Sequence, residues 1–579
     1  MTDRTQLRDV PEHIRERIRL PEGQQGPDSG EFVLYWMRTA VRGHENPALD
    51  AALVAARQLD RPLLVYHAVS ETYRYASDRF HTFILHGARD VSSELRERNI
   101  GYVCHVERPG QRGRHLEKLA GRAALVVTED MPVEPLLSWT RTLQSSVATP
   151  VWCVDTACIV PMRSVGRAYG RAYKFRNATR EMRDERIGRE WIEQPDPTTA
   201  FVPDELPFDP VDIGSADIPS LVASCDIDHA IGAVPGTPGG SAAGYARWNA
   251  FRESGLDYYD KRRNNPTQGG VSRLSPYLHF GHVSPLRIGR ETWANTSSGA
   301  RKFVDELFTW RELSHAFCFY NRERDLESVD ILPDWARETL QEHESDQRPA
   351  LYEWETLVRG ATDDDFWNLL QHSLLTHGEL HNNVRMTWAK ALLKWTPDAQ
   401  TALELAIDLN HRYALDGRDP NSYQGILWCF GHFDRPFDPE RPIYGKVRPR
   451  DTDWHAGRVD VGKYRDIVHR PLVDHPPRVA VIGAGLSGLF CARTLSDPQL
   501  NVDVFEKSRG AGGRMATRRV DDHDLRFDHG AQYFTARDSR FRRYVRSWQQ
   551  SGFVREWDVD IGVFDGESLA PKDTETQRF

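Results

Sequence analysis

The sequence predicts three folded parts: an N-terminal α/β domain with a parallel sheet, an all-α domain, and a C-terminal βαβ segment. Three observations carry this prediction. Short apolar runs without polar alternation separate amphipathic stretches over residues 31–157. Long amphipathic patterns with little strand character fill residues 241–470, and a glycine-rich turn follows a short apolar run at 478–482. Covered parallel strands and surface helices produce patterns of these kinds.

The division of the chain follows changes in composition. With 579 residues, the chain is too long for a single hydrophobic core. The stretch 194–240 is rich in Pro, Gly and Asp, which is typical of an irregular connection over the surface. The expected parts are a flexible N-terminal tail at 1–29, the α/β domain at 30–158, an interdomain linker at 159–240, the helical domain at 241–470 and a partial domain at 478–579.

Five apolar runs are the expected strands of the N-terminal sheet. Because they contain few polar positions, we expect helices to cover both faces of this sheet. The pattern from 78 to 98 is typical of one such helix. The runs lie at residues 32–36, 62–66, 102–106, 125–127 and 151–154.

The composition indicates where the protein is located and which partners it can bind. No apolar run is long enough to span a bilayer, and residues 1–30 lack the apolar core of a signal peptide. The seven cysteines form no CxxC pair, which indicates free thiols in a reducing compartment and hence a cytoplasmic protein. A net charge of −9 does not indicate a nucleic-acid binder, but a local basic patch is sufficient for phosphate contacts.

Polar and aromatic residues of the helical region are the candidates for a functional site. Glu306 and Trp310 are four residues apart and share one helix face, where a carboxyl and an indole can bind a flat polar ligand such as a nucleobase. The stretch 409–423 is dense in Asp, Asn and Arg between two helical patterns, which favours a binding loop. Taken alone, Glu306 and Trp310 fit a surface acid beside a core indole better.

A tryptophan stripe lies in the same region. Trp388 and Trp395 are seven residues apart, about two helical turns, and Trp367 begins the preceding helical stretch. Aligned indoles can pass an electron hole stepwise because Trp is easily oxidised. Without further context, core packing explains this stripe better.

Four motifs give these residues a context. The stretches 272–281, 310–313, 385–390 and 415–421 read SRLSPYLHFG, WREL, RMTWAK and LDGRDPN. In their order and spacing, the residues from about 31 to 468 resemble the class II cyclobutane pyrimidine dimer photolyases of the photolyase/cryptochrome family. The resemblance covers roughly three quarters of the chain. It implies light-dependent repair of double-stranded DNA that contains such dimers, by a monomer that uses FAD.

The resemblance assigns roles residue by residue. Asn410 matches the residue that faces flavin N5, and Arg385 with Asp416 matches the ion pair beside the flavin ring. The pocket for the flipped-out dimer would be formed by four residues, Glu306, Trp310, Met386 and Trp428, and Asn410 would act with them as a catalytic residue. Electrons would pass along Trp388, Trp367 and Trp395, in the order proximal, middle and distal. The FAD phosphate contacts would be Tyr259, Arg263, Ser272 and Ser275.

Two further assignments complete the DNA-binding and antenna parts. Arg435 is the candidate for filling the gap that a flipped dimer leaves, within a loop at 431–437 that is shorter than the usual form of the family. Trp310 and Trp428 would also contact the DNA. The N-terminal domain would be of the Rossmann-like antenna type, and the residues leave open whether it holds an antenna chromophore.

The C-terminal segment carries a dinucleotide fingerprint. Gly483, Gly485 and Gly488 form GxGxxG after an apolar run, and Glu506 ends the next run. Such glycines let pyrophosphate approach a helix N-terminus, and the acid binds ribose hydroxyls. With Arg514 in a second glycine-rich stretch, the segment resembles the start of a renalase-like flavin amine oxidase. We expect a truncated Rossmann-type unit that binds a second FAD or NAD(P) weakly, or no ligand.

Alternatives to repair remain open at this point. A cryptochrome-like light sensor would bind the same flavin without repair, although the four pocket residues are present. A flavin oxidoreductase acting through the C-terminal unit would need domains that the segment lacks. His377 and His381 have the spacing of a zinc site, but Glu379 does not directly follow the first histidine, so no metal site is predicted.

Overall fold

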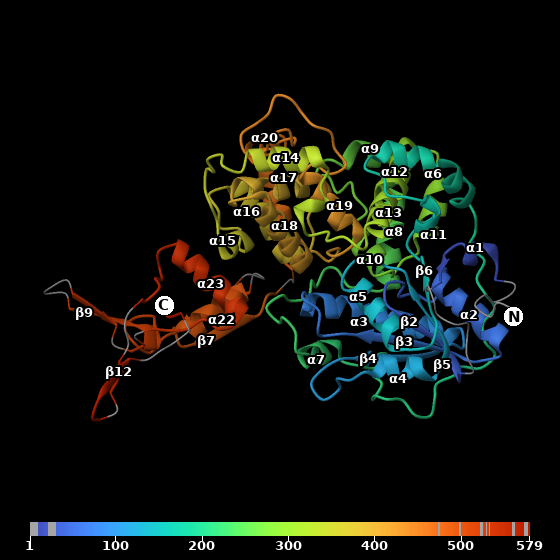
Figure 1. Ribbon diagram of the computed structural model, residues 1–579, viewed down its shortest axis with the longest axis horizontal. Coiled ribbons are helices and arrows are strands. Elements are labelled where there is room, and N and C mark those ends of the chain that lie inside the picture. Colours follow the sequence, from blue (N-terminus) through green and yellow to red (C-terminus); the bar gives the residue numbers. More distant parts are fainter. Residues whose placement is uncertain are drawn as a thin grey trace.

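The computed structural model describes residues 10–20, 30–472, 475–496, 500–520, 525–528, 530–531, 533–558, 562–564, 566–571 and 577–579. Across these ranges the predicted fold class is confirmed. Figure 1 shows an N-terminal α/β layer structure, a helical middle region beside it, and a small C-terminal segment set to one side.

The N-terminal sheet has six strands in the order β1-β6-β5-β2-β3-β4. All neighbouring strands are parallel except β1, which pairs antiparallel with β6. The five apolar runs form five of these strands, as predicted. The strands are β1 Ile18–Arg19, β2 Phe32–Met37, β3 Leu63–Val69, β4 Gly101–Val106, β5 Ala123–Glu129 and β6 Val151–Val154.

Helices cover both faces of this sheet, which explains why its strands show no polar alternation. Val33 and Tyr35 of β2 pack toward α2 (Pro47–Leu59) and α3 (Asp78–Glu97). Phe32 and Leu34 pack on the opposite face, toward α4 (His115–Arg122) and α5 (Leu136–Ser146). Successive side chains of a strand point to opposite faces, so every position of β2 is buried.

The prediction of a flexible tail at 1–29 is wrong for residues 10–20. These form α1 (Glu12–Arg15) and strand β1, while residues 1–9 and 21–29 lie outside the described part. Buried Arg17 anchors the segment, because its guanidinium donates to the carbonyl oxygens of Cys158 at 2.6 Å and Ile159 at 3.1 Å. A two-residue strand held by one arginine leaves no periodic signal in the sequence.

The range 159–240 is more than an irregular linker. It contains the short 3₁₀ turn η1 (Met162–Val165) and the helices α6 (Ala172–Arg186) and α7 (Ile218–Ala223). Phe175 of α6 is fully buried in the core of the helical region. The part between α6 and α7 is irregular and runs along the sheet domain, where Val211 N donates to Cys104 O at 2.8 Å.

The helical region positions the candidate site. Its main core includes the three predicted chain tryptophans, all of them buried. The elements are α8 Ser241–Ser254, η2 Leu256–Tyr258, α9 Tyr259–Arg262, α10 Ser275–His279, α11 Pro285–Trp293, α12 Ser298–Asp305, η3 Glu306–Trp310, α13 Arg311–Tyr320, η4 Val329–Ile331, α14 Asp334–Glu342, α15 Trp354–Val358, α16 Asp365–His377, α17 Asn382–Ala391, η5 Leu392–Lys394, α18 Ala399–Tyr413, α19 Pro420–Cys429, α20 Thr452–Ala456 and α21 Val461–Val468.

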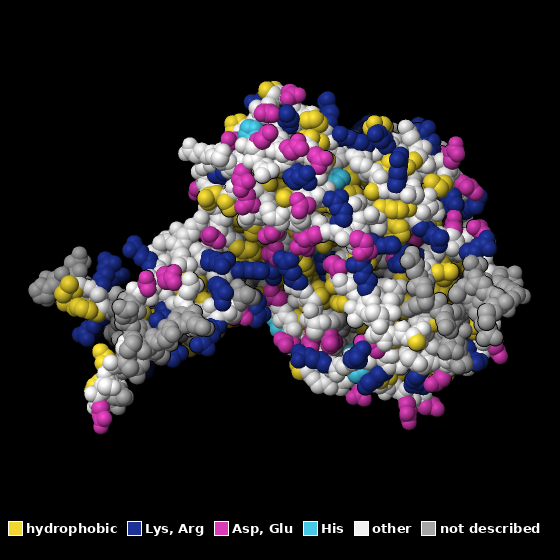
Figure 2. Space-filling view, in the orientation of Figure 1, with side chains coloured by type: hydrophobic (Ala, Val, Ile, Leu, Met, Phe, Trp, Pro, Cys, Tyr) yellow, Lys and Arg dark blue, Asp and Glu magenta, His cyan; other side chains and the backbone are white. Residues whose placement is uncertain are grey.

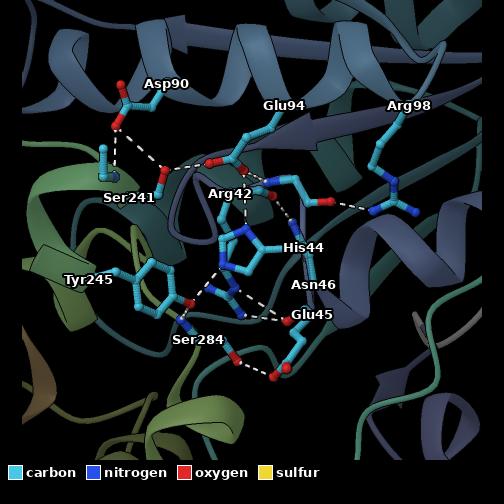
Figure 3. Close-up of polar contacts among 12 residues, drawn as sticks. Arg42, His44, Glu45, Asn46, Asp90, Glu94, Arg98, Ser241, Tyr245 and Ser284 are labelled. Carbon is cyan, nitrogen blue, oxygen red and sulfur yellow. Dashed lines mark hydrogen bonds and ion pairs between the residues drawn. The ribbon is translucent and has the colours of Figure 1, made fainter. Parts of the chain in front are cut away.

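A polar network joins the sheet domain to the helical region (Figure 3). Buried Arg42 donates to Gly281 O at 3.0 Å, from the loop after β2 to the turn after α10. The His44 ring lies between Glu94 Oε2 at 3.2 Å and Tyr245 Oη at 2.7 Å. Because buried Arg42 and the half-buried His44, Glu94 and Tyr245 find their partners across the junction, this network holds the two domains together.

The C-terminal segment contains a parallel pair of strands joined by a helix. Figure 1 shows it meeting the molecule near α15. Its elements are β7 Arg478–Ile482, α22 Leu486–Ser496, β8 Asn501–Phe505, η6 Gly513–Met515, β9 Thr517–Val520, β10 Leu525–Asp528, α23 Ser539–Gln550, β11 Gly562–Phe564 and β12 Leu569–Pro571.

The surface is of mixed charge. Figure 2 shows Lys and Arg side chains interspersed with Asp and Glu on the viewed face. Of the helices in the described ranges, none is both long and apolar enough to cross a membrane.

Candidate functional site

The expected lesion pocket lies where α12 passes into α13 and faces α19. Glu306–Trp310 form a π-type turn, η3, between the two helices, a feature that often marks functional sites. The rings of Trp310 and Trp428 stack with centroids 5.0 Å apart and planes 13° apart. Both indoles are half-buried. The structure therefore brings these two predicted residues together as a stacked indole pair that is partly exposed to solvent.

Glu306 begins the same turn and is paired with two cations. Its Oε1 lies 2.8 Å from Arg263 Nη2 and 2.7 Å from Lys302 Nζ. Burial acts to lower the pKa of Lys302, but contacts with Asp305 and Glu306 raise it overall. The acid is thus well paired, as its expected role requires. Arg263, a predicted contact of the cofactor phosphate, forms this ion pair with Glu306, and its contact with a phosphate stays a prediction.

Met386 and a residue that the sequence analysis missed lie together. Met386 is half-buried on α17, and Arg450 Nη1 is 3.9 Å from its sulfur. Arg450 also hydrogen-bonds the side-chain oxygen of Asn383. In the sequence, Arg450 stands in a charged stretch to which the sequence analysis assigned no role. Its alternation with Lys446 and Arg448 was the available signal.

The loop that carries Arg435 presents cations to solvent. Arg435 is exposed, and its guanidinium carbon lies 5.0 Å from the centre of the Phe437 ring. The guanidinium carbon of Arg448 lies 5.5 Å from the same ring. This arrangement places two arginines on one aromatic side chain, in the cation–π geometry that is typical of such pairs.

The predicted flavin-binding residues include a buried acceptor that lacks a partner. Asn410 is fully buried on α18, and its Oδ1 has no hydrogen-bond partner among the described residues. Arg385 Nη2 lies 3.0 Å from Asp416 Oδ1, so the predicted ion pair is present. Arg385 Nε is buried and also unpartnered within the described chain. Because buried polar atoms require partners, these residues fit a bound ring with N–H and carbonyl groups, such as a flavin.

The other three predicted phosphate contacts lie at nearby chain turns. Tyr259 is buried at the start of α9, where burial raises the pKa of its hydroxyl to about 12. Ser272 is half-buried just before α10, and Ser275 is exposed as the first residue of that helix. Their contacts with a phosphate stay a prediction.

The three chain tryptophans form a continuous series in the predicted order. Trp388 and Trp367 are stacked, with centroids 6.2 Å apart and planes 4° apart. Trp367 meets Trp395 edge-on, with centroids 5.2 Å apart. The indole N–H of Trp367 donates to Trp388 O at 2.9 Å, and that of Trp388 to Gln371 Oε1 at 2.8 Å. These bonds fix the ring orientations.

The glycine loop of the C-terminal segment has the form that the fingerprint predicts. Gly483 has a φ of +99°, a left-handed conformation, and a Cβ on Gly488 would lie 1.9 Å from Gly483 O. Glu506 Oε2 accepts from Ala484 N at 2.6 Å. Backbone N–H groups of Ser508 and Ala484 lower the pKa of the exposed Glu506 carboxyl to about 2. The acid is therefore ionised and next to the loop.

Gly485 and Arg514 are the other two residues of the predicted C-terminal nucleotide site. Gly485 forms an isolated parallel bridge with Gly512, which brings the two glycine-rich stretches together. Arg514 is exposed in η6. No described contact joins its side chain to the loop.

The histidine pair does not form a metal site. His377 ends α16 and its Nε2 lies 2.7 Å from Val468 O, whereas His381 precedes α17. The two residues belong to different helices, so the spacing of four does not place them on one face. Over the described ranges, no group of three or more His, Cys, Asp or Glu residues could hold a metal ion.

Comparisons with known proteins agree with this architecture. Residues 33–197 match the DNA photolyase family model, and residues 481–548 match an NAD(P)-binding Rossmann-like domain. The fold resembles a cryptochrome structure from Synechocystis, with a TM-score of 0.59, 16% identity, and coverage of 76% of this chain and 89% of that chain. A photolyase-type fold is thus combined with a nucleotide-binding segment.

One curated relative decides the family. A deoxyribodipyrimidine photo-lyase from Methanothermobacter thermautotrophicus is 32% identical over 459 residues, which cover 79% of this chain and 99% of the relative. The chain therefore belongs to the photolyase family, with a class II-type sequence and a C-terminal NAD(P)-binding Rossmann-like segment. An L-amino-acid oxidase from Gloydius halys is 37% identical over 113 residues, 19% of this chain and 21% of that protein.

Proposed function

We propose that the protein uses light to split cyclobutane pyrimidine dimers in DNA. One observation carries the proposal: the half-buried stack of Trp310 and Trp428 next to paired Glu306. Met386, which shares this pocket in the family pattern, directly follows Arg385 of the candidate flavin site. The candidate pocket for the dimer would thus adjoin the candidate flavin site.

The cofactor that the family implies is FAD. Arg385 and Asp416 would contact its ring, and Asn410 Oδ1 would accept a hydrogen bond from it. Its phosphates would be contacted by Tyr259, Arg263, Ser272 and Ser275. When bound and reduced, FAD supplies light-driven one-electron donation to the dimer. An antenna chromophore in the N-terminal domain stays a proposal without a chemical identity.

The side chains of the pocket would bind and orient the lesion. A dimer inside the duplex must be swung out of the stack, which costs less than for an intact base because the lesion pairs badly. Trp310 and Trp428 offer a stacking surface worth about 1–3 kcal/mol per base. Glu306, held by Arg263 and Lys302, would lie at the carbonyl edge of the dimer, where its carboxylate can accept a hydrogen bond from a ring N–H next to the carbonyl.

Basic side chains around the pocket would hold the DNA backbone. Arg450 lies beside Met386, and Arg435 and Arg448 flank Phe437 on the adjoining loop. Phosphate contacts of this kind give affinity without sequence specificity, and they weaken with salt. Arg435, exposed on its loop, is proposed to enter the gap that the flipped dimer leaves.

The C-terminal segment would hold the ADP part of a dinucleotide. Gly483, Gly485 and Gly488 leave room for pyrophosphate before α22, and Glu506 stands beside them as the ribose acceptor. We propose that this ligand is a second FAD or NAD(P), bound weakly.

The decisive experiment is a repair assay. Purified protein with reduced flavin is illuminated with near-UV or blue light in the presence of an oligonucleotide that carries one thymine dimer. Light-dependent return of intact thymines, absent in the dark, is the expected result. A protein that binds and photoreduces FAD but repairs no dimer would be a light sensor, and dark oxidation of amines or nicotinamides would instead indicate an oxidoreductase.

A further inference from the structure

The C-terminal segment is docked firmly against the helical region. Its helix α23 packs beside α15, and Val545 and Ser547 of α23 are buried. Arg493 of α22 forms an ion pair of 2.6 Å with Glu355, whose side chain is only 5% exposed. Figure 2 shows Lys and Arg side chains where this segment meets the rest of the molecule.

Aromatic and arginine side chains form the middle of this contact. Trp354 of α15 meets the ring of Tyr544 at 5.5 Å, edge to face. The guanidinium carbon of Arg543 lies 5.2 Å from the Trp354 ring, and that of Arg412 lies 5.9 Å from it. Trp, Tyr and Arg dominate the binding energy of interfaces, so the contact is built as a stable one.

Two polar side chains of α23 bind the backbone on both sides of Tyr352. Gln550 Oε1 accepts from Glu353 N at 2.7 Å, and its Nε2 donates to Leu351 O at 2.6 Å. Ser547 Oγ accepts from Glu355 N at 3.0 Å, in the first turn of α15. Residues 351–355 are therefore held from the outside by the C-terminal segment.

Tyr352 itself continues the tryptophan series toward the surface. Its ring centre lies 5.5 Å from that of Trp395, and its N–H donates to Trp395 O at 3.1 Å. Its hydroxyl donates to Asp363 Oδ2 at 2.9 Å. Unlike the three tryptophans, Tyr352 is half-exposed. It thus has an oxidisable ring toward the chain and a proton acceptor toward solvent.

We propose that the docked C-terminal segment is a positioning element of the electron-transfer chain, with Gln550 and Ser547 holding residues 351–355 so that Tyr352 stays against Trp395 and Asp363. This inference rests on the proposed function. Bound FAD would supply the light-driven electron acceptor, and Trp388 would donate one electron, so that the hole passes through Trp367 and Trp395 to Tyr352. Tyr352 would give its proton to Asp363. A thiol in solution would then return one electron and one proton to the tyrosyl radical, and Asp363 would release its proton to solvent.

The test uses the full chain with bound FAD. We expect Gln550→Ala and Ser547→Ala to lower the yield of tyrosyl radical, seen by transient absorption, and the rate of flavin photoreduction severalfold. The loss is partial because Tyr352 keeps its backbone bond to Trp395. Repair by pre-reduced enzyme should stay at the wild-type level, which a general folding defect would not allow.

Controls separate this proposal from the one it rests on. Gln549→Ala is the matched control, because none of the described side-chain bonds to 351–355 involves Gln549. Arg493→Glu undocks the segment by charge reversal against Glu355 and should act like Gln550→Ala. If hydrogen exchange shows 351–355 released in Arg493→Glu while the tyrosyl radical forms as in wild type, the proposal is wrong. Normal photoreduction in Trp388→Phe would instead refute the chain, and the positioning role with it.

Discussion

Replacing Trp388 by phenylalanine tests the electron-transfer chain at its proximal member. Trp388 stacks on Trp367 with centroids 6.2 Å apart, and no other described aromatic contact joins Trp367 to the candidate flavin side. Phenylalanine is much harder to oxidise than tryptophan. We therefore expect Trp388→Phe to block photoreduction of oxidised FAD, while repair by pre-reduced enzyme stays nearly intact.

The same substitution should destabilise the fold by a calculable amount. Trp388 is fully buried, and Phe cannot donate the 2.8 Å hydrogen bond to Gln371 Oε1. Leaving that oxygen unpaired costs about 1–3 kcal/mol. The smaller ring adds part of the about 3–5 kcal/mol that full truncation of a buried Trp costs. We expect the free energy of unfolding to fall by about 2–4 kcal/mol, which a domain of ordinary stability tolerates.

A matched variant separates the two effects. Trp248 is also fully buried, and its indole N–H donates to Glu291 Oε2 at 2.6 Å. Trp248 is not a member of the electron-transfer series. Trp248→Phe should lose comparable stability in urea unfolding and keep normal photoreduction, followed by the flavin absorbance under blue light with a thiol present. Wild-type photoreduction in Trp388→Phe, or equal loss in Trp248→Phe, would refute the assignment.

Three further predictions concern the pocket, the acid limit and the C-terminal loop. Glu306→Ala should lower repair yield about tenfold, as for loss of a hydrogen bond to a charged group, with a smaller change in DNA affinity by titration. Burial alone would raise the pKa of Asp419, but its hydrogen bond with His279 and nearby charges hold it well below the usual range. The contribution of Asp419 to the free energy of unfolding is therefore present above about pH 4 and is lost as the pH falls. Asp419→Asn should flatten the decrease of this free energy at acid pH, measured by urea unfolding. Gly488→Ala places a methyl group against Gly483 O and should abolish dinucleotide binding in calorimetry, while repair persists. An unchanged repair yield in Glu306→Ala would contradict the first prediction. An unchanged decrease at acid pH in Asp419→Asn would contradict the second, and unchanged dinucleotide binding in Gly488→Ala would contradict the third.

Sequence patterns predicted the sheet and the helical region because burial is continuous along the strands and periodic along the helices. Strand β2 is buried at every position, so its apolar run reports both covered faces at once. Helix α6 escaped prediction because its 15 residues are mostly charged or polar, and only a few side chains such as Phe175 enter the core. Strand β1 escaped because its two residues depend on pairing with β6, a long-range contact.

The candidate site divides in the same way. Spacing placed Glu306 and Trp310 on one helix face, and the family resemblance added Trp428, but neither predicted that the two indoles stack on each other. The pairing of Glu306 with Arg263 depends on how α9 and α12 pack, which periodicity does not contain. Arg450 lies 64 residues from Met386 in the chain and reaches it only through the fold. Such contacts between distant segments follow from tertiary packing alone.

The π-type turn at Glu306–Trp310 has a consequence for how this pocket tolerates change in chain length. A π turn is equivalent to one extra residue inserted in an α-helix. Deleting one residue there would restore a regular helix but rotate everything on one side by about 100° relative to the other. Either the face of α12 that carries Phe303 or the face of α13 that carries Phe317 would then turn out of the core. A substitution at η3 thus keeps the relative rotation of α12 and α13, whereas a change of chain length does not.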